Sequence, residues 1–526
     1  MVYPSVIDEQ DLSESPVRII LRAFPRFRAD PLSAPCDVRG LPVTDTPPLP
    51  ADFRLRPDPS LNVLQDARVL LGGAPYRLMR LTADAVPVIS AWLDGKPVGE
   101  RRSAALLARR LVQAGMLHPV PPPDAPRPAV TVVVPVRDRP EQLARCLSGL
   151  RKGTRVIVVD DGSVRPEAVE RVVHAAGARL IRRDVNGGPA AARNTGLAAA
   201  TTEVVAFVDS DCVPGPGWIP ALLPHFADPA VAAVAPRIVA DNPGRGALAA
   251  YETAGSALDM GPRESVVRPG AAVPYVPSAA LLVRRAAAGT GFDERMRVGE
   301  DVDLVWRLAR AGHHVRYDPS VTVAHQHRTR PGPWVAQRVQ YGSSAAPLAT
   351  RHPGTLPAAA MAGWSAAAWG LVLARRPLAG AVLTAGTTAM LAHKLSGWCN
   401  EPWRMAAQLG GKGTLLAGEQ LGRTLTRTWW PLALPLAVTV PRLRLPLAAA
   451  AALPPLLAWR RARPPVPVVP WAAIRLADDI AYSVGVWKGC LRERTTAPLL
   501  PRLWWFSPDG ITPPSRARRG KDRGRG

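Results

Sequence analysis

From residue 129 onward the chain alternates short apolar runs with amphipathic stretches. Buried strands are predicted for the apolar runs at 129–134, 156–159 and 204–208, and helices for stretches at 141–150 and 190–199. Strands that are apolar on both faces are typical of a parallel sheet covered by helices on each side. The pattern therefore predicts an α/β domain with a mostly parallel, Rossmann-like sheet over residues 129–345.

A different pattern precedes this domain. Three short strands at 61–64, 69–71 and 76–79 are followed by two helices at 83–93 and 103–114. This order predicts a small winged-helix-like module at 51–118. The Pro- and Arg-rich residues 1–50 form an arm without sustained periodicity, and the Pro-rich residues 119–128 predict a stiff linker between independent units.

The last third of the chain is dominated by uncharged segments, which are 353–374, 377–392, 429–440 and 445–459. They are rich in Ala, Gly and Pro, so their tendency to cross a bilayer is weak. Trp and Arg at their ends favour helices that lie in a membrane interface, and buried helices packed on the catalytic domain are the alternative. We expect a membrane-associated helical region at 346–500 and a basic tail at 501–526.

The net charge of +24 comes almost entirely from arginine, and the isoelectric point is about 11.1. Such a charge attracts phosphates, nucleic acid or an anionic membrane surface. The five cysteines have no paired spacing, which argues for a reducing compartment and against a structural zinc site. No signal peptide opens the sequence, so we expect a cytoplasmic protein at the inner face of the cell membrane.

Carboxylates directly follow two of the predicted strands. Asp209 and Asp211 follow one apolar run, and Asp160 and Asp161 follow another. Strand ends of this kind hold the ligands of open α/β sheets. The Asp-Ser-Asp pair suits Mg²⁺ or Mn²⁺, which bind one or two carboxylates together with diphosphate oxygens. An acidic turn that ends a strand is the alternative for an isolated pair.

Two predicted helix starts add charged groups. The turn at 186–189 opens a helix whose backbone N–H groups, together with Arg193, would attract a phosphate. Glu300 and Asp301 open a helix at 302–311. Acids also stabilise the start of a helix through its dipole, so a capping role is the alternative to a catalytic one.

The order of the motifs is more specific than any single motif. The chain contains PVRDR at 135–139, VVDDGS at 158–163, NGGPAAARNTG at 186–196, FVDSDC at 207–212, GFDE at 291–294 and GEDVDLVWRL at 299–308. This succession resembles the family 2 glycosyltransferases of the GT-A fold, and the resemblance covers about residues 129–330. It implies an inverting transfer that depends on a metal ion and uses a sugar nucleotide.

The resemblance also implies roles in binding the donor. Asp160 and Asp161 would contact the uracil and ribose of a UDP-sugar. We expect Pro135, Arg137 and Arg193 to complete the nucleotide site.

The remaining motifs would hold the metal and carry the chemistry. Asp209 and Asp211 would bind the ion and the sugar nucleotide, and Asp301 would remove the proton of the acceptor hydroxyl while Glu300 orients the acceptor.

Related enzymes often complete the metal site with a histidine near this position. We take His325 as the candidate and His327 as the alternative, because neutral imidazole binds Mn²⁺. A surface pair without a ligand role is the other interpretation.

The module at 51–118 resembles the PqqD-like peptide-binding domains through LQDARVLLGGAPYRLMRLT and the helix pair after it. The resemblance implies that a precursor peptide adds a strand to an exposed sheet edge. A DNA-binding winged helix is the alternative, since the second helix region carries Arg101, Arg102, Arg109 and Arg110. It has Ala and Leu where base-reading side chains would help, so we expect no specific nucleic-acid partner.

Together, the three parts resemble the glycosyltransferases of the mycofactocin system from about residue 50 onward. The resemblance implies transfer of glucose from UDP-glucose to a peptide-derived small molecule, the redox cofactor precursor premycofactocin, to build a β-linked oligosaccharide. A lipid or cell-envelope glycan is the alternative acceptor, which the apolar C-terminal region favours. A basic DNA-binding protein with an inert α/β scaffold is the alternative outside the enzymes.

Overall fold

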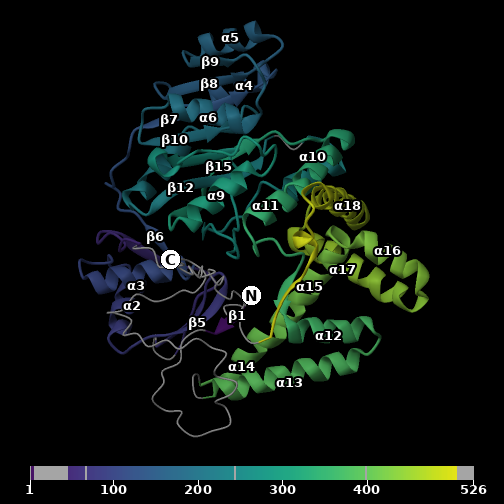
Figure 1. The fold of residues 1–526 in the computed structure, drawn as a ribbon. Helices are drawn as coiled ribbons and strands as arrows, with labels where there is room; N and C mark the ends of the chain where they lie inside the picture. Colours follow the sequence, from purple (N-terminus) through teal and green to yellow (C-terminus); the bar gives the residue numbers. More distant parts are fainter. Residues whose placement is uncertain (1, 5–45, 65–67, 242–243, 397–399, 506–526) are drawn as a thin grey trace, which may run out of the picture.

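The computed structural model of the protein describes residues 2–4, 46–64, 68–241, 244–396 and 400–505 (Figure 1). The α/β domain occupies the upper part of Figure 1, the N-terminal module lies below it, and the C-terminal helices pack beside both. The predicted α/β class is confirmed by this architecture.

Within the described residues, a nine-stranded mixed sheet organises the α/β domain, in the order β11-β15-β12-β14-β10-β7-β8-β9, with β13 paired to β15. Its strands are β7 Val130–Val136, β8 Arg155–Asp161, β9 Arg179–Arg183, β10 Val204–Val208, β11 Cys212–Pro214, β12 Val231–Ala240, β13 Ser265–Val266, β14 Ala280–Arg284 and β15 His314–His325. The strands β9, β8, β7 and β10 run parallel, whereas β14 is antiparallel to both of its neighbours. The apolar runs in the sequence predicted strands of the parallel part of the sheet, namely β7, β8 and β10.

Helices cover both faces of this sheet. They are α4 Pro140–Ser148, α5 Pro166–Ala175, α6 Pro189–Ala199, α7 Trp218–Leu222, α8 Ala247–Gly255 and α9 Glu300–Arg310. On one face Val133 and Phe207 pack with residues of α6 and α9, and on the other face Val132 and Val134 pack with residues of α4, α5 and α7. Because strand side chains alternate between faces, an uninterrupted apolar run is needed to bury both.

The N-terminal module contains the predicted strands and helices and one further strand pair. Its elements are β2 Arg54–Pro57, β3 Asn62–Leu64, β4 Val69–Gly72, β5 Tyr76–Arg80, α2 Ala85–Leu93, α3 Arg102–Gln113 and β6 Leu117–Val120. The pair β2–β6 is antiparallel, so the first residues of the predicted linker belong to a strand. At the chain start, β1 Val2–Pro4 pairs parallel to β5, within what was predicted to be an arm without regular structure. Residues 1 and 5–45 lie outside the described residues.

The module is docked on the α/β domain, and the prediction that the two are independent units stays a prediction. Arg109 of α3 makes a two-pronged ion pair with Asp228, at 2.6 and 2.7 Å, and both side chains are almost fully buried. Arg109 is therefore unavailable for the DNA-binding alternative. Across the same contact, Arg316 of β15 and Arg56 of β2 both bind the carboxylate of Glu264.

The other face of the module packs on the C-terminal helices. These are α10 Pro331–Ser343, α11 Ala345–Arg351, α12 Gly363–Leu373, α13 Pro377–Leu395, α14 Pro402–Ala406, α15 Lys412–Arg427, α16 Trp430–Thr439, α17 Arg444–Ala462 and α18 Val468–Glu493. Val69, Leu71 and Leu78 of the module share one buried cluster with Leu395 and Met405. The predicted helical C-terminal region is confirmed, and among the described residues no helix is both long and apolar enough to cross a membrane.

The boundary predicted for the basic tail is too early. Residues Arg502–Trp504 form β17, which pairs parallel to β16 Ala360–Ala362. Trp364 also donates its indole N–H to the carbonyl oxygen of Trp505. Residues 506–526, which include the predicted arginine cluster, lie outside the described residues.

Candidate active site

The Asp-Ser-Asp motif lies at the carboxyl end of β10, as predicted. The backbone N–H of Asp209 donates to Ala279 beside it, and the chain then turns into β11. The antiparallel register of β11 and β15 sets Cys212 opposite His325. His325 therefore lies next to Asp211, with 3.6 Å between its Nε2 atom and the Asp211 Oδ1 atom.

Arginine side chains contact both carboxylates of this motif. Arg139 donates from Nη1 to Oδ2 of Asp211 over 3.0 Å, and Arg193 donates from Nη2 to Oδ1 of Asp209 over 2.6 Å. Burial is the main cause that raises the pKa of Asp209, with Arg193 opposing it and Asp211 adding to it. The sequence motifs did not point to Arg139 as a partner of Asp211.

Arg193 also reaches the second acidic motif. Its Nη1 atom donates to Oε1 of Glu300 over 2.7 Å, and its guanidinium lies 5.4 Å from the ring centroid of Phe292. The side chain is 4% exposed. Its Nε atom is buried and has no hydrogen-bond partner within the described part of the chain. Arg193 thus links Asp209 and Glu300, which approach from two different elements.

The acids that open α9 have different surroundings. Glu300 is buried, and this burial, together with the adjacent Asp301 carboxylate, raises its pKa to about 7 although Arg193 opposes the shift. Asp301 is half-buried, and its two oxygens accept the backbone N–H groups of Ser278 and Val302 at 3.2 and 2.8 Å. Of the two, Asp301 retains the more accessible carboxylate. These contacts fit both the catalytic and the capping interpretation.

Asp160 and Asp161 lie at the carboxyl end of β8 but are buried and bonded within the protein. Asp160 accepts from the Ser163 N–H at 3.0 Å and from Arg182 at 2.7 Å. Asp161 accepts from Arg183 and from the N–H groups of the turn at 187–188, at 2.7 to 3.0 Å. These carboxylates fix two turns that border the site, and their direct contact with uracil and ribose stays a prediction.

The other residues predicted to bind the donor nucleotide lie at the neighbouring strand end. Pro135 is half-buried in β7, in register with Val159 of β8. Arg137 is exposed just beyond the strand, with its Nε atom 3.6 Å from Asp138. Both are positioned along the edge that also bears Asp160 and Asp209.

The structure distinguishes the two candidate histidines. The Nδ1 atom of His327 lies 3.2 Å from the Nδ1 atom of His325 and 3.9 Å from the Oε2 atom of Glu252. Burial, followed by His325 and Arg338, lowers the pKa of His327 to about 4. Within the described residues, the contact of His325 is with an acid of the Asp-Ser-Asp motif, whereas that of His327 is with Glu252. The geometry favours His325 as the candidate ligand.

The donor chemistry of Asp209, Asp211 and His325 fits a hard divalent ion that takes further oxygen ligands from a diphosphate. Among the described residues, no three His, Cys, Asp or Glu side chains are grouped so that they alone could hold a metal ion. One or two protein carboxylates are enough for such an ion when phosphate oxygens complete its shell. The residues therefore fit a shared site better than an all-protein one.

The GFDE motif has a supporting role that the sequence did not define. Asn194 of α6 exchanges hydrogen bonds with the backbone of Phe292 and donates to Glu294. Asp293 binds Arg351 of α11. The loop thus connects α6, α9 and α11, and it holds the helices that carry Arg193 and Glu300.

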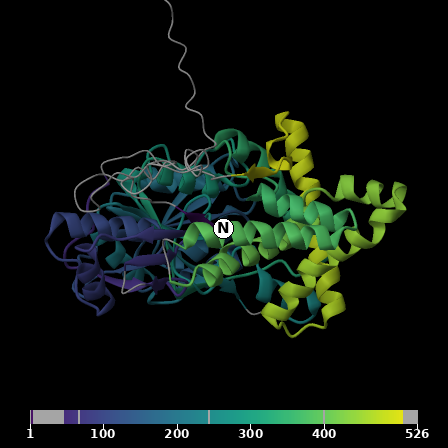
Figure 2. The same ribbon diagram turned by 90° about the horizontal axis from the view of Figure 1, so that it is seen from below.

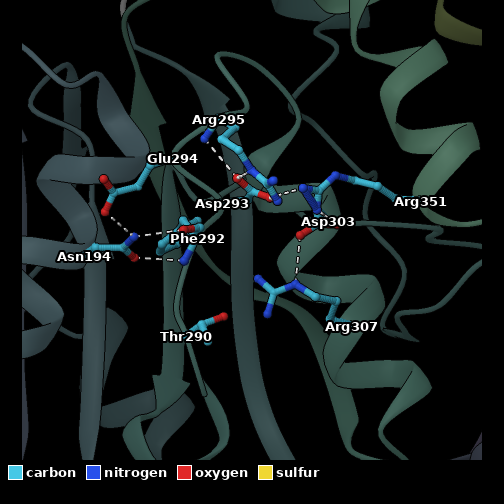
Figure 3. Close-up of a pocket in the computed structure, with 9 residues that line it drawn as sticks. All are labelled: Asn194, Thr290, Phe292, Asp293, Glu294, Arg295, Asp303, Arg307 and Arg351. Atoms are coloured by element: carbon cyan, nitrogen blue, oxygen red, sulfur yellow. Dashed lines mark hydrogen bonds and ion pairs between the residues drawn. The ribbon is translucent and has the colours of Figure 1, made fainter. Parts of the chain in front are cut away.

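This loop also borders a polar cavity of about 430 Å³ (Figure 3). The cavity is lined by Asn194, Thr290, Phe292, Asp293, Glu294, Arg295, Asp303, Arg307 and Arg351. Asp303 accepts from Arg307, and His352 lies 2.9 Å from its other oxygen. Positions two apart on a helix point to different sides, so the cavity lies away from Asp301.

The sequence relatives decide the family. The model of Glycosyl transferase family 2 matches residues 131–289. Over 471 residues the chain is 41% identical to the pre-mycofactocin glycosyltransferase of Mycobacterium tuberculosis (strain ATCC 25618 / H37Rv), covering 86% of this chain and 98% of that protein. This chain belongs to the pre-mycofactocin glycosyltransferase family. The predicted membership of the mycofactocin-system glycosyltransferases is confirmed, and the chain is a glycosyltransferase.

Solved structures similar to this pre-mycofactocin glycosyltransferase family member are more distant. A mannosyltransferase from Pyrobaculum calidifontis, in complex with GDP-Man and Mn²⁺, is 19% identical with a TM-score of 0.41, over 70% of this chain and 90% of that chain. Glucosyl-3-phosphoglycerate synthase from Mycobacterium tuberculosis, in complex with Mn²⁺, UDP and glucosyl-3-phosphoglycerate, is 21% identical with a TM-score of 0.30, over 43% of this chain and 80% of that chain. The family assignment rests on the sequence relatives.

Proposed function

We propose that this chain is an inverting, divalent-metal-dependent transferase that moves glucose from UDP-glucose to a pre-mycofactocin-type, peptide-derived acceptor and builds a β-linked oligosaccharide. The observation that carries the proposal is the link through Arg193 between Asp209 and Glu300. Inversion at an anomeric carbon needs a base on one face and a stabilised diphosphate on the other. The two acidic motifs supply groups for both tasks at one edge of the sheet.

On the donor side, Asp209, Asp211 and His325 would hold Mg²⁺ or Mn²⁺. When bound, the ion neutralises the charge that develops on the departing diphosphate. The cationic side chains of Arg139 and Arg193 now bind these carboxylates. Arg193 would stay between the motifs and keep Asp209 oriented, because its guanidinium is fixed by Glu300 as well.

On the acceptor side, Asp301 would take the proton of the attacking hydroxyl. Its carboxylate accepts hydrogen bonds from two backbone N–H groups, which fix its orientation. Glu300 would keep Arg193 in place through their buried contact. This role would come in addition to its predicted role in orienting the acceptor.

The N-terminal module would bind a precursor peptide by strand addition. Its sheet has the order β1-β5-β4-β3, so β3 is the edge strand on the side away from β1. An edge strand offers unpaired backbone groups to an added peptide. We therefore assign β3 as the edge available to a peptide.

The C-terminal helices would bind an anionic membrane surface from the cytoplasmic side. Figure 1 and Figure 2 show α16 and α17 at the end of the molecule away from the N-terminal module, whereas α13 and α14 pack on that module. In α16 and α17, Leu432, Leu434 and Leu445 are exposed, and no acidic residue occurs between Glu419 and Asp478. Exposed leucines and arginines suit the boundary between headgroups and acyl chains. The same surface favours the second candidate function, a lipid-linked or cell-envelope glycan acceptor.

One experiment tests donor and acceptor together. Purified protein is incubated with Mn²⁺, one of several radiolabelled UDP-sugars, and either pre-mycofactocin or a lipid-linked glycan. We expect label from UDP-glucose to enter pre-mycofactocin, with inverted configuration at the new bond. Transfer to the lipid-linked acceptor alone would establish the second candidate, and transfer from a different UDP-sugar alone would contradict the proposed donor.

A further inference from the structure

Three segments are linked by contacts that begin at Asp301, and the first is the loop before β14. Trp306 of α9 donates its indole N–H to the carbonyl oxygen of Pro274 over 2.7 Å. Four residues later, the N–H of Ser278 donates to Asp301 itself. Because both ends of this short loop are bound to α9, the intervening Tyr275 is held close to Asp301.

The second segment is the end of α10. Gly299, which precedes Glu300, has φ of +84°, and a Cβ built on it would lie 3.0 Å from the Cβ of Ser344. The start of α9 therefore touches the junction of α10 and α11. Tyr341 lies three residues before this contact, and its hydroxyl accepts a hydrogen bond from Gln337 at 2.9 Å.

The third segment is α18, which crosses α10 at very close range. A Cβ on Gly342 would lie 2.0 Å from the carbonyl oxygen of Tyr482, and a Cβ on Gly485 would lie 2.1 Å from that of Val339. Only glycine permits this approach. It brings Tyr482 of the C-terminal region next to the turn that carries Tyr341.

A cation completes the group. The guanidinium of Arg427 in α15 lies 3.7 Å from the ring centroid of Tyr482, and its Nη1 atom donates to Asp479 over 3.0 Å. Arg427 remains 34% exposed, and Tyr275, Tyr341 and Tyr482 are all half-buried. Each of these four side chains is therefore partly accessible.

The electrostatics agree with this arrangement. Burial, followed by Tyr482 and Asp301, raises the pKa of Tyr275 to about 12. Burial is also the main cause that raises the pKa of Tyr341, and Asp301 adds to it while Arg338 opposes it. Tyr275 and Tyr341 are therefore both close enough to Asp301 for its charge to act on their phenol groups.

We propose that Tyr275, Tyr341, Tyr482 and Arg427 form the acceptor subsite, in which the tyrosine side chains receive a ring of the acceptor beside Asp301. This inference rests on the proposed function, because it takes Asp301 as the group that meets the acceptor hydroxyl. Ligand sites are commonly lined by aromatic side chains with a few fixed polar groups. A ring positioned on rigid tyrosines would bring its hydroxyl to the base in one orientation.

The subsite gives the C-terminal helices a part in catalysis. Tyr482 and Arg427 belong to the region predicted from its apolar segments to be membrane-associated, yet Tyr482 lies against α10, whose end touches the start of α9. The ring has two sources: the aromatic part of the unglycosylated acceptor, or a sugar that has already been attached.

Acceptor affinity measured in four variants tests the subsite. Calorimetric binding and transfer kinetics are compared for Tyr482→Ala, Tyr482→Phe, Arg427→Gln and Ile480→Ala, with pre-mycofactocin and its monoglucosylated product as separate acceptors. Ile480 is an exposed residue of α18, so Ile480→Ala controls for truncation on this helix. We expect Tyr482→Ala and Arg427→Gln to weaken acceptor binding at least tenfold, with the Kd for UDP-glucose unchanged, and Tyr482→Phe to restore it.

If affinity is lost for both acceptors, the bound ring belongs to the part that they share. If affinity is lost for the glucosylated acceptor alone, the bound ring is the attached sugar. Acceptor affinities within twofold of the wild type in Tyr482→Ala, with or without a lower Tm, would overturn the subsite. If the wild type binds the acceptor but transfers no sugar, the proposed function fails, and the effect of Tyr482→Ala on binding still decides the subsite.

Discussion

Arg193 and Glu300 lie 107 positions apart in the chain, and their side chains form a buried hydrogen-bonded ion pair of 2.7 Å. The same guanidinium binds Asp209 at 2.6 Å. One cation therefore stabilises two carboxylates from the metal motif and the catalytic motif. Removing it leaves both without their partner in a poorly solvated place, which is more costly than losing a surface pair.

Substitution Arg193→Met should accordingly destabilise the protein by about 3–5 kcal/mol and abolish most transfer. Arg193→Lys keeps the charge but lacks the planar fork, so we expect an intermediate effect. For each variant, chemical unfolding measures the stability, and a separate titration measures the affinity for UDP-glucose. Arg145→Met is the matched control, because Arg145 is half exposed and pairs with Asp241 at the surface, where a loss of less than about 1 kcal/mol is expected. Equal destabilisation by Arg145→Met and Arg193→Met would contradict the linking role.

The metal prediction concerns Asp211. Asp211→Asn and treatment with EDTA should each remove most of the transfer activity, because the diphosphate would leave without charge neutralisation. Circular dichroism and Tm should change little for Asp211→Asn, since the side chain is partly exposed. Asp124→Asn, in the exposed linker, serves as the control. Undiminished turnover in the presence of EDTA would rule out a required metal ion.

The catalytic base is tested by Asp301→Asn. General-base removal typically lowers rates by ~10²–10⁴-fold, so single turnover should slow by that order with donor affinity nearly unchanged. The amide oxygen can still accept one backbone N–H, which limits the loss of stability. Asp303→Asn, in the same helix turn but bonded to Arg307 and His352, should lower Tm without changing the donor Kd. An Asp301→Asn protein that melts early but transfers normally would show a capping role only.

Stability should depend on pH through Glu300. Its pKa is raised from 4.5 to about 7, so the folded protein holds the proton more tightly than the unfolded chain does. The contribution of this residue to the free energy of unfolding therefore falls as pH rises from about 4.5 to 7, and is constant above that range. Unfolding of wild type and Glu300→Gln, measured at steps between pH 4.5 and 8, isolates the effect. Parallel curves would show that Glu300 does not titrate in this window.

The docking of the N-terminal module is tested at Asp228. Asp228→Ala leaves Arg109 buried without its acid, so we expect destabilisation of about 3–5 kcal/mol and faster proteolytic cleavage in the linker at 121–128. Arg102→Ala, on an exposed face of the same helix, should stay within about 0.5 kcal/mol of the wild type. Unchanged unfolding and proteolysis of Asp228→Ala would show that this ion pair does not hold the module on the α/β domain.

The sequence by itself determined the local elements and the acidic strand ends. The apolar run at 204–208 coincides with β10, and the runs at 129–134 and 156–159 match β7 and β8 to within three residues at each end. Burial of both strand faces leaves a direct mark on the sequence, because it requires consecutive apolar residues. The motif order likewise identified the family before any geometry was known.

Only the tertiary structure decided which side chains meet. His325 reaches Asp211 because β11 and β15 pair in a register that sets Cys212 opposite it. Arg109 faces Asp228 because α3 is docked on the catalytic domain, and Tyr482 approaches α10 through facing glycines. Periodicity reports the burial of one element at a time, whereas these contacts depend on strand order and packing between segments far apart in the chain.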